Sequence, residues 1–380
     1  MCSDRIPTRN GEKLTMSLRV LIIKASAMGD IIHALPVLDY LHKVCPGVKV
    51  GWAVEEPFKE ILSGNPLLQR LHVIRTRTWR KNLFSAATLR EVGGVLKALR
   101  SSRYDMVFDI QGNLKSGMIA RLSGSQKRFG FNRGFLQESV NALFTNRKID
   151  MRGQDDNAGS RCLRVVSAAF EQDYSSMELE VDIHTGPEED AAAERLLEEC
   201  QADPVLLFHG GTTWQTKFWS EERWIELGKG VQAVFPQAMM LLSWGNASEK
   251  ASAQRVAATI GCRARLLDRY SLKGITAVIK RVAVVVGGDT GLIHLAAAVG
   301  TPTVSYYRAS DGSLSGPRGP KHIIVQSPVS CSRCFRTSCD QDSACRSSIT
   351  ADAVLAGIER LQPCFKARTA DPAISGEDRS

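Results

Sequence analysis

Residues 284–304 read VVVGGDTGLIHLAAAVGTPTV, and this stretch decides the fold class. A valine run is followed by a glycine-rich turn and then by an apolar, helix-like segment that ends at Gly300, just before Pro302. This order predicts a buried parallel strand, a turn and a helix. The glycines let the backbone approach a ligand closely, and the start of the helix carries partial positive charge. We therefore expect a diphosphate at this turn.

A purely structural interpretation of the same turn is also open. Asp289 or Thr290 can cap the helix, which stabilises it by about 1 kcal/mol, and His294 can pack against the sheet. A second turn favours the ligand interpretation. Residues 209–224, HGGTTWQTKFWSEERW, follow the apolar run Val205–Phe208 and offer hydroxyl groups and an ammonium group. Two turns suited to phosphate in one half of the chain indicate a nucleotide site.

Two further turns carry acids. Residues 243–249, SWGNASE, follow another apolar run, and Glu249 is either a ribose ligand or an acid at a helix start. In the first half of the chain, residues 24–38 read KASAMGDIIHALPVL after the run Val20–Ile23. A carboxylate at Asp30 would repel a bound diphosphate. Asp30 is therefore either a helix cap or a residue that serves chemistry rather than nucleotide binding.

The rest of the chain repeats this alternation of short apolar runs and amphipathic helices. The expected strands are Arg19–Ile23, Lys49–Val54, Leu71–Ile74, Met106–Ile110, Val205–His209, Met239–Ser243, Val282–Val286 and Thr303–Tyr307. Such alternation predicts an α/β fold with two doubly wound, Rossmann-like domains that face each other across a cleft. We expect an N-terminal domain over 18–185 and a C-terminal domain over 186–364. The polar segments 1–17 and 365–380 are expected to be a disordered leader and tail.

The composition, 43% hydrophobic and 23% charged, is that of a soluble globular protein. No apolar run approaches the roughly 20 residues that span a bilayer, and the N-terminus lacks the apolar core of a secretory signal. The cytoplasm is therefore the expected compartment, where the ten cysteines stay reduced or bind metal. The net charge of +9 favours an anionic partner. The chain shows no helix-turn-helix, RNP or zinc-finger spacing, which argues against nucleic acid.

Taken together, the motifs resemble those of glycosyltransferase family 9, the ADP-heptose:lipopolysaccharide heptosyltransferases. The likeness is strongest to members of the heptosyltransferase I type and runs from about Val20 to Ile358. Besides the turns above, it is carried by WAVEEPF at 52–58, TWRKNLFSA at 78–86 and YDMVFDIQGNLKSG at 104–117. The resemblance implies a GT-B fold and an inverting transfer of L-glycero-D-manno-heptose from ADP-heptose to Kdo-lipid A. It also implies peripheral contact with the cytoplasmic face of the inner membrane, and no obligatory cofactor or metal.

The resemblance assigns roles to individual residues. Asp30 would be the catalytic base that takes the proton of the acceptor hydroxyl, and Lys217 would stabilise the departing ADP. The implied donor ligands are Thr212, Thr213, Lys217, Glu249, Asp289, Thr290, Gly291 and His294. The candidate acceptor ligands are Lys24, Gly29, Arg77, Arg80 and Lys81, with Arg75 and Lys115 nearby in the same motifs. Without the family context, this basic run would more often be a solvated face.

A cluster of cysteines, Cys331, Cys334, Cys339 and Cys345, departs from the heptosyltransferase I pattern. Four thiolates can form a closed zinc site, but zinc ligands usually come as two CxxC pairs, so a structural metal and reduced loop cysteines both stay open. The departure also leaves open whether a first heptose, a later heptose or a different sugar is added.

Two other classes of function remain as rivals. A non-catalytic protein that binds the lipopolysaccharide core or a nucleotide would not need Asp30. A nucleotide-linked oxidoreductase is disfavoured because the first turn lacks GxGxxG. The oligomeric state is not indicated by the sequence.

Overall fold

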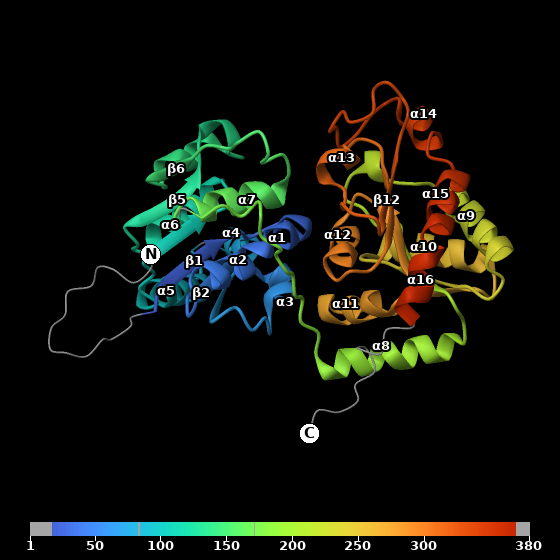
Figure 1. Cartoon of the computed structure of the whole chain (residues 1–380), viewed down its shortest axis with the longest axis horizontal. Helices are drawn as coiled ribbons and strands as arrows, with labels where there is room; N and C mark the ends of the chain where they lie inside the picture. The colour runs from blue at the N-terminus through green and yellow to red at the C-terminus, as the bar shows by residue number, and fades with distance from the viewer. Residues whose placement is uncertain (1–16, 83, 171, 370–380) are drawn as a thin grey trace. The chain divides into compact units, whose positions relative to one another are not determined.

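The computed structural model describes residues 17–82, 84–170 and 172–369 (Figure 1). The chain divides between His184 and Thr185 into two compact units, one residue before the boundary expected from the sequence. The expected leader lies outside the described residues except for Ser17, and so do residues 370–380 of the expected tail. The tail was expected to begin at residue 365, but the helix α16, Gln362–Thr369, continues beyond that point.

In the first unit, six parallel strands form one sheet in the order β3-β2-β1-β4-β5-β6. The strands are β1 Arg19–Ile23, β2 Lys49–Glu55, β3 Arg70–Ile74, β4 Met106–Asp109, β5 Lys127–Phe131 and β6 Arg147–Ile149. The α-helices are α1 Met28–Ala34, α2 Pro36–Val44, α3 Lys59–Leu62, α4 Thr76–Lys81, α5 Ala86–Ser101, α6 Leu114–Leu122 and α7 Ala158–Ser167. The winding of the sheet reverses between β1 and β4, and ligands of such sheets bind at that point.

The second unit repeats the same topology with the order β12-β11-β10-β7-β8-β9. Its strands are β7 Val205–His209, β8 Met239–Ser243, β9 Ala264–Leu266, β10 Val284–Gly288, β11 Thr303–Tyr307 and β12 His322–Gln326. Its α-helices are α8 Pro187–Cys200, α9 Glu221–Val234, α10 Ala247–Ile260, α11 Leu272–Arg281, α12 Gly291–Ala298, α13 Gly312–Ser315, α14 Asp342–Ser347, α15 Ala351–Arg360 and α16. Here the winding reverses between β7 and β10.

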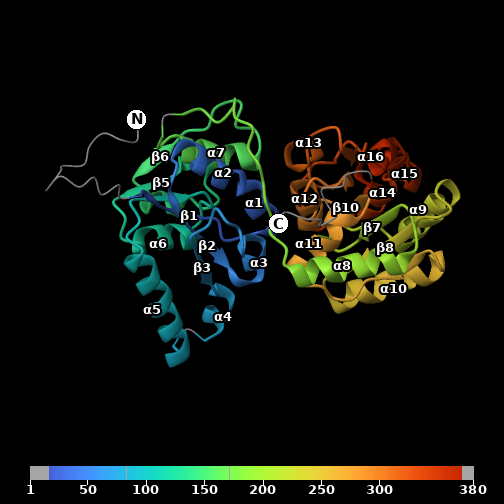
Figure 2. The ribbon, with the colours of Figure 1, turned by 60° about the horizontal axis from the view of Figure 1, so that its bottom comes forward.

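Helices cover both faces of each sheet (Figure 2), which explains why the central strands are apolar on every residue rather than on alternate ones. In β1, the run Val20–Ile23 is fully buried. In the second unit, Trp219 and Trp224 pack edge to face with 5.0 Å between ring centroids, and both contact Tyr306 of β11. Burial of these rings anchors α9 on the sheet and fixes the chain that leads into it.

The sequence missed four strands, β5, β6, β9 and β12. The strands β6 and β9 have only three residues each, and both lie at sheet edges, where apolar patterning is weak. The assignment of Gly287 and Gly288 to the turn was also wrong, because β10 continues through both. A Cβ atom at Gly287 would lie 3.0 Å from the carbonyl oxygen of His209, so this glycine serves close strand packing rather than ligand approach.

Within the described ranges of the chain, none of the helices is both long and apolar enough to cross a membrane.

Candidate active site

An ion pair between Lys217 and Asp289 forms the centre of the site in the second unit. Lys217 ends the short 3-10 helix Gln215–Lys217 that follows β7, and Asp289 directly follows β10. The Lys217 ammonium donates to Oδ2 of Asp289 over 2.6 Å, and it lies 4.3 Å from the ring centroid of Trp214. The side chains of Lys217 and Asp289 are only 16% and 9% exposed. The pair therefore fixes a positive charge where the winding of the sheet reverses.

Asp289 is held ionised by its neighbours. Burial alone would raise the pKa of this carboxyl group, but the hydrogen bond from His294 and the charge of Lys217 outweigh burial and hold the pKa well below its usual range. Nε2 of His294 lies 3.4 Å from Oδ1 of Asp289. His294 is buried on α12, as the packing interpretation predicts, and it also contacts this acid. The sequence assigned all three residues to the donor site, and the structure brings them together.

Thr290 is the N-cap residue of α12, but its side chain makes no capping hydrogen bond. Its hydroxyl is buried and has no hydrogen-bond partner among the described residues. A buried donor without a partner costs free energy, so a ligand that accepts its hydrogen bond would be favoured here. Capping by a side chain, one of the two interpretations of this turn, is therefore not what the structure shows. The helix begins at Gly291, whose N–H belongs to the first turn.

The turn after β7 carries the remaining polar candidates. Thr212 is half-buried and its hydroxyl accepts a hydrogen bond from the Trp214 N–H at 3.4 Å, whereas Thr213 is exposed. His209, the last residue of β7, is buried, and its Nδ1 lies 3.0 Å from the Ser243 hydroxyl. Burial lowers the pKa of His209 to about 4, so the ring is neutral at neutral pH. Lys217 therefore supplies the positive charge of this turn.

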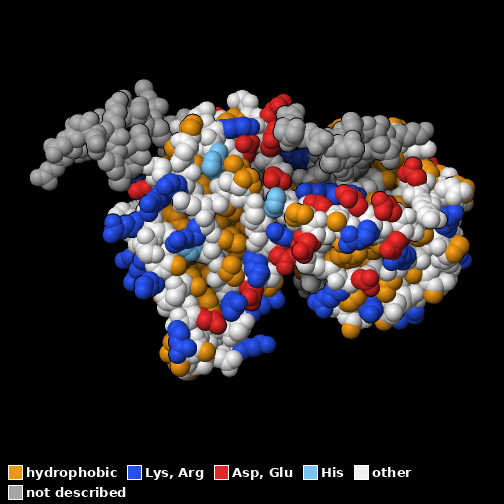
Figure 3. Space-filling model, turned by 90° about the horizontal axis from the view of Figure 1, so that it is seen from below, with side chains coloured by type: hydrophobic (Ala, Val, Ile, Leu, Met, Phe, Trp, Pro, Cys, Tyr) orange, Lys and Arg blue, Asp and Glu red, His pale blue; other side chains and the backbone are white. Residues whose placement is uncertain are grey.

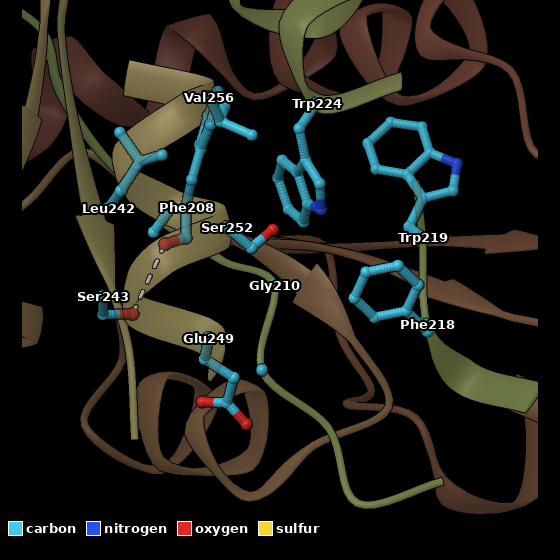
Figure 4. A pocket seen from close by; sticks show the side chains of 12 residues that line it. Phe208, Gly210, Phe218, Trp219, Trp224, Leu242, Ser243, Glu249, Ser252 and Val256 are labelled. Atoms are coloured by element: carbon cyan, nitrogen blue, oxygen red, sulfur yellow. Dashed lines mark hydrogen bonds between the residues drawn. The ribbon is translucent and has the colours of Figure 1, made fainter. Parts of the chain in front are cut away.

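Glu249 lines a small cavity of about 40 Å³ beside the same turn (Figure 4). Its carboxylate accepts hydrogen bonds from the Gly245 N–H and from the Asn246 side chain, each at 2.7 Å, so it stabilises the start of α10. A Cβ atom at Gly211 would lie 2.5 Å from this carboxylate, so a larger residue there would displace the Glu249 side chain. The cavity is otherwise largely aromatic and aliphatic, and it extends to the ring of Trp224. Glu249 thus both caps a helix and faces a cavity.

A network that the sequence analysis missed holds the Lys217 turn in place. Arg308, only 1% exposed, donates to the carbonyl oxygen of Phe218 at 2.5 Å and forms an ion pair with Asp342. The hydroxyl of Thr216 donates to the carbonyl oxygen of Arg336 over 2.5 Å. These contacts tie residues 216–218 to the loop that contains the four cysteines. The signal available in the sequence was an arginine, Arg308, directly after the apolar run Thr303–Tyr307.

The four cysteines themselves do not form a metal site. Cys331 and Cys334 are exposed, whereas Cys339 and Cys345 are half-buried, and all four are free thiols. No cluster of three or more metal-ligating side chains occurs in the part of the chain that the structure describes, which includes this whole loop. The zinc interpretation of these cysteines is therefore wrong for this structure, because the fold does not bring their thiols together around one point. The loop serves instead to brace the Lys217 turn.

In the first unit, Asp30 lies in the first turn of α1 and is half-buried. Its Oδ2 accepts the Ala27 N–H at 3.1 Å, which is the bond that the capping interpretation predicts. Gly29 precedes it in the same turn. The loop before α1 is held by the side-chain oxygen of Gln111, which accepts from the N–H groups of Ala25 and Ser26 at 3.0 and 3.1 Å. The carboxylate of Asp30 is thus presented by a rigid loop where the winding of this sheet reverses.

Lys24 is less accessible than the sequence suggested. It is 5% exposed, and its ammonium donates to the carbonyl oxygen of Ile110 at 3.1 Å. This contact links the ends of β1 and β4, so Lys24 acts on the main chain of the loop that leads to Asp30. Sequence patterns could not reveal this, because both strand ends had to be neighbours first.

A basic cavity of about 370 Å³ lies beside this loop. Its lining includes the cations Arg75, Arg77, Arg80 and Lys115, the acids Glu55 and Glu56, and Ser26 of the loop before α1. Lys115 pairs with the buried Glu55 at 2.6 Å, and Arg75 pairs with Glu56 at 2.7 Å. Arg77 and Arg80 are exposed on α4 and carry the remaining positive charge. Lys81, also expected to bind the acceptor, is exposed but does not line the cavity.

Comparison with known proteins identifies the family. A model of glycosyltransferase family 9 (heptosyltransferase) matches residues 92–344. The chain belongs to this family. A lipopolysaccharide heptosyltransferase 1 from Pseudomonas aeruginosa is 33% identical over 92% of this chain and 94% of its own length. The lipopolysaccharide heptosyltransferase 1 of Escherichia coli K12 is 32% identical over 82% of this chain and 94% of its own length.

Solved structures of family 9 agree with the fold. The Escherichia coli heptosyltransferase WaaC with ADP superimposes with a TM-score of 0.75 and 30% identity, over 90% of this chain and 100% of that one. The same enzyme with ADP-2-deoxy-2-fluoro heptose gives a TM-score of 0.72. The expected α/β architecture of the GT-B type is thus confirmed, and this member of family 9 is an enzyme, a heptosyltransferase-type glycosyltransferase.

Proposed function

We propose that this enzyme transfers L-glycero-D-manno-heptose from ADP-heptose to the Kdo of a lipid A acceptor, in the inner core of lipopolysaccharide. The single observation that carries the proposal is the Lys217–Asp289 pair beside the partnerless hydroxyl of Thr290. It combines a fixed cation, an ionised carboxylate and a helix start, which suits a diphosphate joined to a sugar.

In the proposed donor site, cationic and neutral donor groups bind the diphosphate, and carboxylates bind the sugar hydroxyls. The diphosphate contacts Lys217, the hydroxyls of Thr212, Thr213 and Thr290, and the N–H groups at Gly291. Asp289 would repel phosphate, and so it accepts hydrogen bonds from heptose hydroxyls, with His294 fixing its orientation. Glu249 lies in the first turn of α10, which follows β8, and there it accepts hydrogen bonds from ribose hydroxyls.

The proposed acceptor site is the basic cavity of the first unit. Kdo carries a carboxylate and lipid A carries phosphates, so the acceptor is strongly anionic. Arg77 and Arg80 are placed to bind these groups, because their charge is not used by the acids that pair with Arg75 and Lys115. Lys81 extends the positive surface beyond the cavity. Gly29 and Lys24 shape the loop between the cavity and Asp30.

In the proposed reaction, Asp30 is the general base. It takes the proton from the acceptor hydroxyl while that oxygen forms a bond to the anomeric carbon of heptose. The bond from the same carbon to the diphosphate oxygen breaks, and ADP leaves with the electron pair. Lys217 and the start of α12 stabilise the negative charge that develops on ADP. Attack from the face opposite the leaving group inverts the anomeric configuration, and this scheme requires no metal or other cofactor.

The cap bond to Ala27 is compatible with this role. It engages Oδ2 of Asp30 and so orients the carboxylate, while Oδ1 takes the proton. We further propose that the enzyme works at the cytoplasmic face of the inner membrane as a peripheral protein, because its acceptor is a lipid. Nucleic acid is not a partner in this scheme.

Turnover measurements with defined substrates test the proposal. Purified enzyme is incubated with ADP-heptose and one of three acceptors: Kdo-lipid A, lipid A lacking Kdo, or an acceptor that already carries one heptose. The masses of the products are measured by mass spectrometry. The proposal expects a product one heptose heavier from Kdo-lipid A alone. A product from the heptosylated acceptor alone would favour the addition of a later heptose, and turnover of another nucleotide-sugar would favour a different sugar. Binding without any turnover would indicate a non-catalytic protein.

A further inference from the structure

The segment between α4 and α5 exposes large apolar side chains that the core does not use. Phe84 is 94% exposed and Leu89 is 61% exposed, the first before α5 and the second in its first turn. Full exposure of a phenylalanine carries no benefit for the folded chain in water. These side chains are therefore available to an external partner. We call this surface the α4–α5 tip, and its members are Phe84, Leu89, Arg77, Arg80, Lys81 and Arg90.

Hydrogen bonds and an ion pair hold the tip in a defined conformation. The indole N–H of Trp79 on α4 donates to Oε2 of Glu91 on α5 at 3.0 Å, and Arg75 lies 3.5 Å from the other oxygen of that carboxylate. The Ser85 side chain caps α5 by accepting the N–H of Thr88 at 3.1 Å. Figure 2 shows α5 extending away from its sheet, and α4 is bound to it by these contacts. The two apolar side chains are consequently presented from a fixed frame.

Positive charge surrounds the apolar residues. The four basic members of the tip are exposed, and none of them has an ion-pair partner among the described residues. The nearby acid Glu91 is already engaged by Trp79 and Arg75. Figure 3 shows hydrophobic and basic side chains gathered at the end of the first unit that α4 and α5 form. Exposed apolar residues ringed by cations complement an anionic bilayer, whose phosphates lie above its acyl chains.

We propose that the α4–α5 tip docks the enzyme on an anionic membrane, with Phe84 and Leu89 inserted between the headgroups and the cations on lipid phosphates. The inference rests on the proposed function, because the acceptor is itself a lipid. Arg77 and Arg80 belong to both surfaces: they line the basic cavity and stand on the helix that leads to the tip. Docking therefore places the cavity at headgroup level, where the sugar of a membrane-embedded acceptor lies.

Vesicle binding tests the proposal without substrates, so its outcome does not depend on turnover. The full chain is sedimented with vesicles of phosphatidylcholine alone or mixed with phosphatidylglycerol. We expect binding to the mixed vesicles that the Phe84→Ser/Leu89→Ser double variant weakens at least tenfold. The matched control is Leu143→Ser, because Leu143 is 76% exposed in the same unit, in the 3-10 helix Ser139–Leu143, and lies outside the tip. This control should bind as the parent does.

Two further measurements distinguish a loss of membrane docking from a loss of folding stability. Thermal unfolding of the double variant should match that of the parent, since the side chains of Phe84 and Leu89 are mostly exposed. Arg90→Gln should weaken binding only to the anionic vesicles. The proposal is overturned if the parent does not bind the anionic vesicles, or if the double variant and the Leu143→Ser control bind these vesicles equally well. It is also overturned if the double variant binds vesicles normally but changes sedimentation of the free enzyme, which would assign the tip to contact with a second copy.

Discussion

The ammonium of Lys217 donates to the carboxylate of Asp289 across 2.6 Å, joining the ends of two strands that are adjacent in space but far apart in the sequence. The pair keeps an acid within a site that we propose for an anionic ligand. The acid offsets the desolvation cost of holding the lysine ammonium in a buried position, and the lysine keeps the acid ionised. A sugar diphosphate suits the pair, because it brings hydroxyls to the acid and phosphate to the ammonium.

Removing the ammonium should act on the chemical step. We expect Lys217→Gln to lower kcat by about 100-fold, because the charge that develops on ADP loses a preorganised partner. Steady-state kinetics with ADP-heptose measure this effect. Lys280→Gln is the control, since Lys280 is a half-buried lysine of the same unit that contacts Thr185 rather than the site. Equal loss in both variants would mean that the effect is not specific to the site.

The same pair predicts a dependence of stability on pH. The folded-state pKa of Asp289 is below its usual range, so its ionised form adds stability that is complete above about pH 4 and is lost only as the pH falls through the lowered value. In Lys217→Met the pKa of Asp289 should rise, because burial is then opposed by fewer partners. Acid unfolding followed by circular dichroism should therefore begin at a higher pH in this variant. An unchanged acid transition would contradict the electrostatic account of the pair.

Asp30→Asn separates catalysis from capping. The asparagine oxygen can still accept the Ala27 N–H, so the free energy of unfolding should change by less than about 1 kcal/mol. The side chain can no longer take a proton, so kcat should fall by about 100-fold or more while the affinity for ADP-heptose stays the same. Urea unfolding, calorimetric titration and kinetics measure the three quantities. A variant as fast as the parent would reduce Asp30 to a structural cap.

Neutralising α4 should affect the acceptor rather than the donor. We expect Arg77→Gln/Arg80→Gln to raise the KM for Kdo-lipid A by about tenfold and to weaken its dependence on salt, since two exposed charges beside the cavity are lost. Lys81→Gln is the matched variant on the same helix. It should have a smaller effect, because Lys81 does not line the cavity. The KM for ADP-heptose serves as the internal reference, and a shift in that constant instead would contradict the assignment.

The buried pair of Arg308 and Asp342 should brace the donor site. Asp342→Ala leaves the Arg308 guanidinium buried without its partner, so we expect the free energy of unfolding to fall by about 3 kcal/mol. The KM for ADP-heptose should rise as well, because Arg308 also holds the carbonyl of Phe218 next to Lys217. Denaturant unfolding and kinetics measure both effects. In Arg308→Met/Asp342→Leu, stability should recover in part but the KM should not, which distinguishes bracing from general loss of stability.

The sequence by itself determined the class of fold and the chemistry that each turn can supply. Continuous apolar runs such as Val20–Ile23 specify strands buried on both faces, and the glycine, hydroxyl and lysine content of residues 209–217 suits phosphate. These features are local in the chain, so they can be read without knowing which segments meet. The short edge strands β6 and β9 could not be read in this way, because three residues at an edge carry too little apolar pattern.

Only the tertiary structure decided which side chains act together. The winding of each sheet reverses between strands that are distant in the sequence, and this places Asp289 against Lys217 and Gln111 against the loop before Asp30. It also turned Lys24 from a candidate acceptor ligand into a buried contact with the main chain, and it showed that the loop with the four cysteines braces the Lys217 turn. Hydrogen bonds and ion pairs act over a few ångströms, and only the folded chain brings these groups within that range.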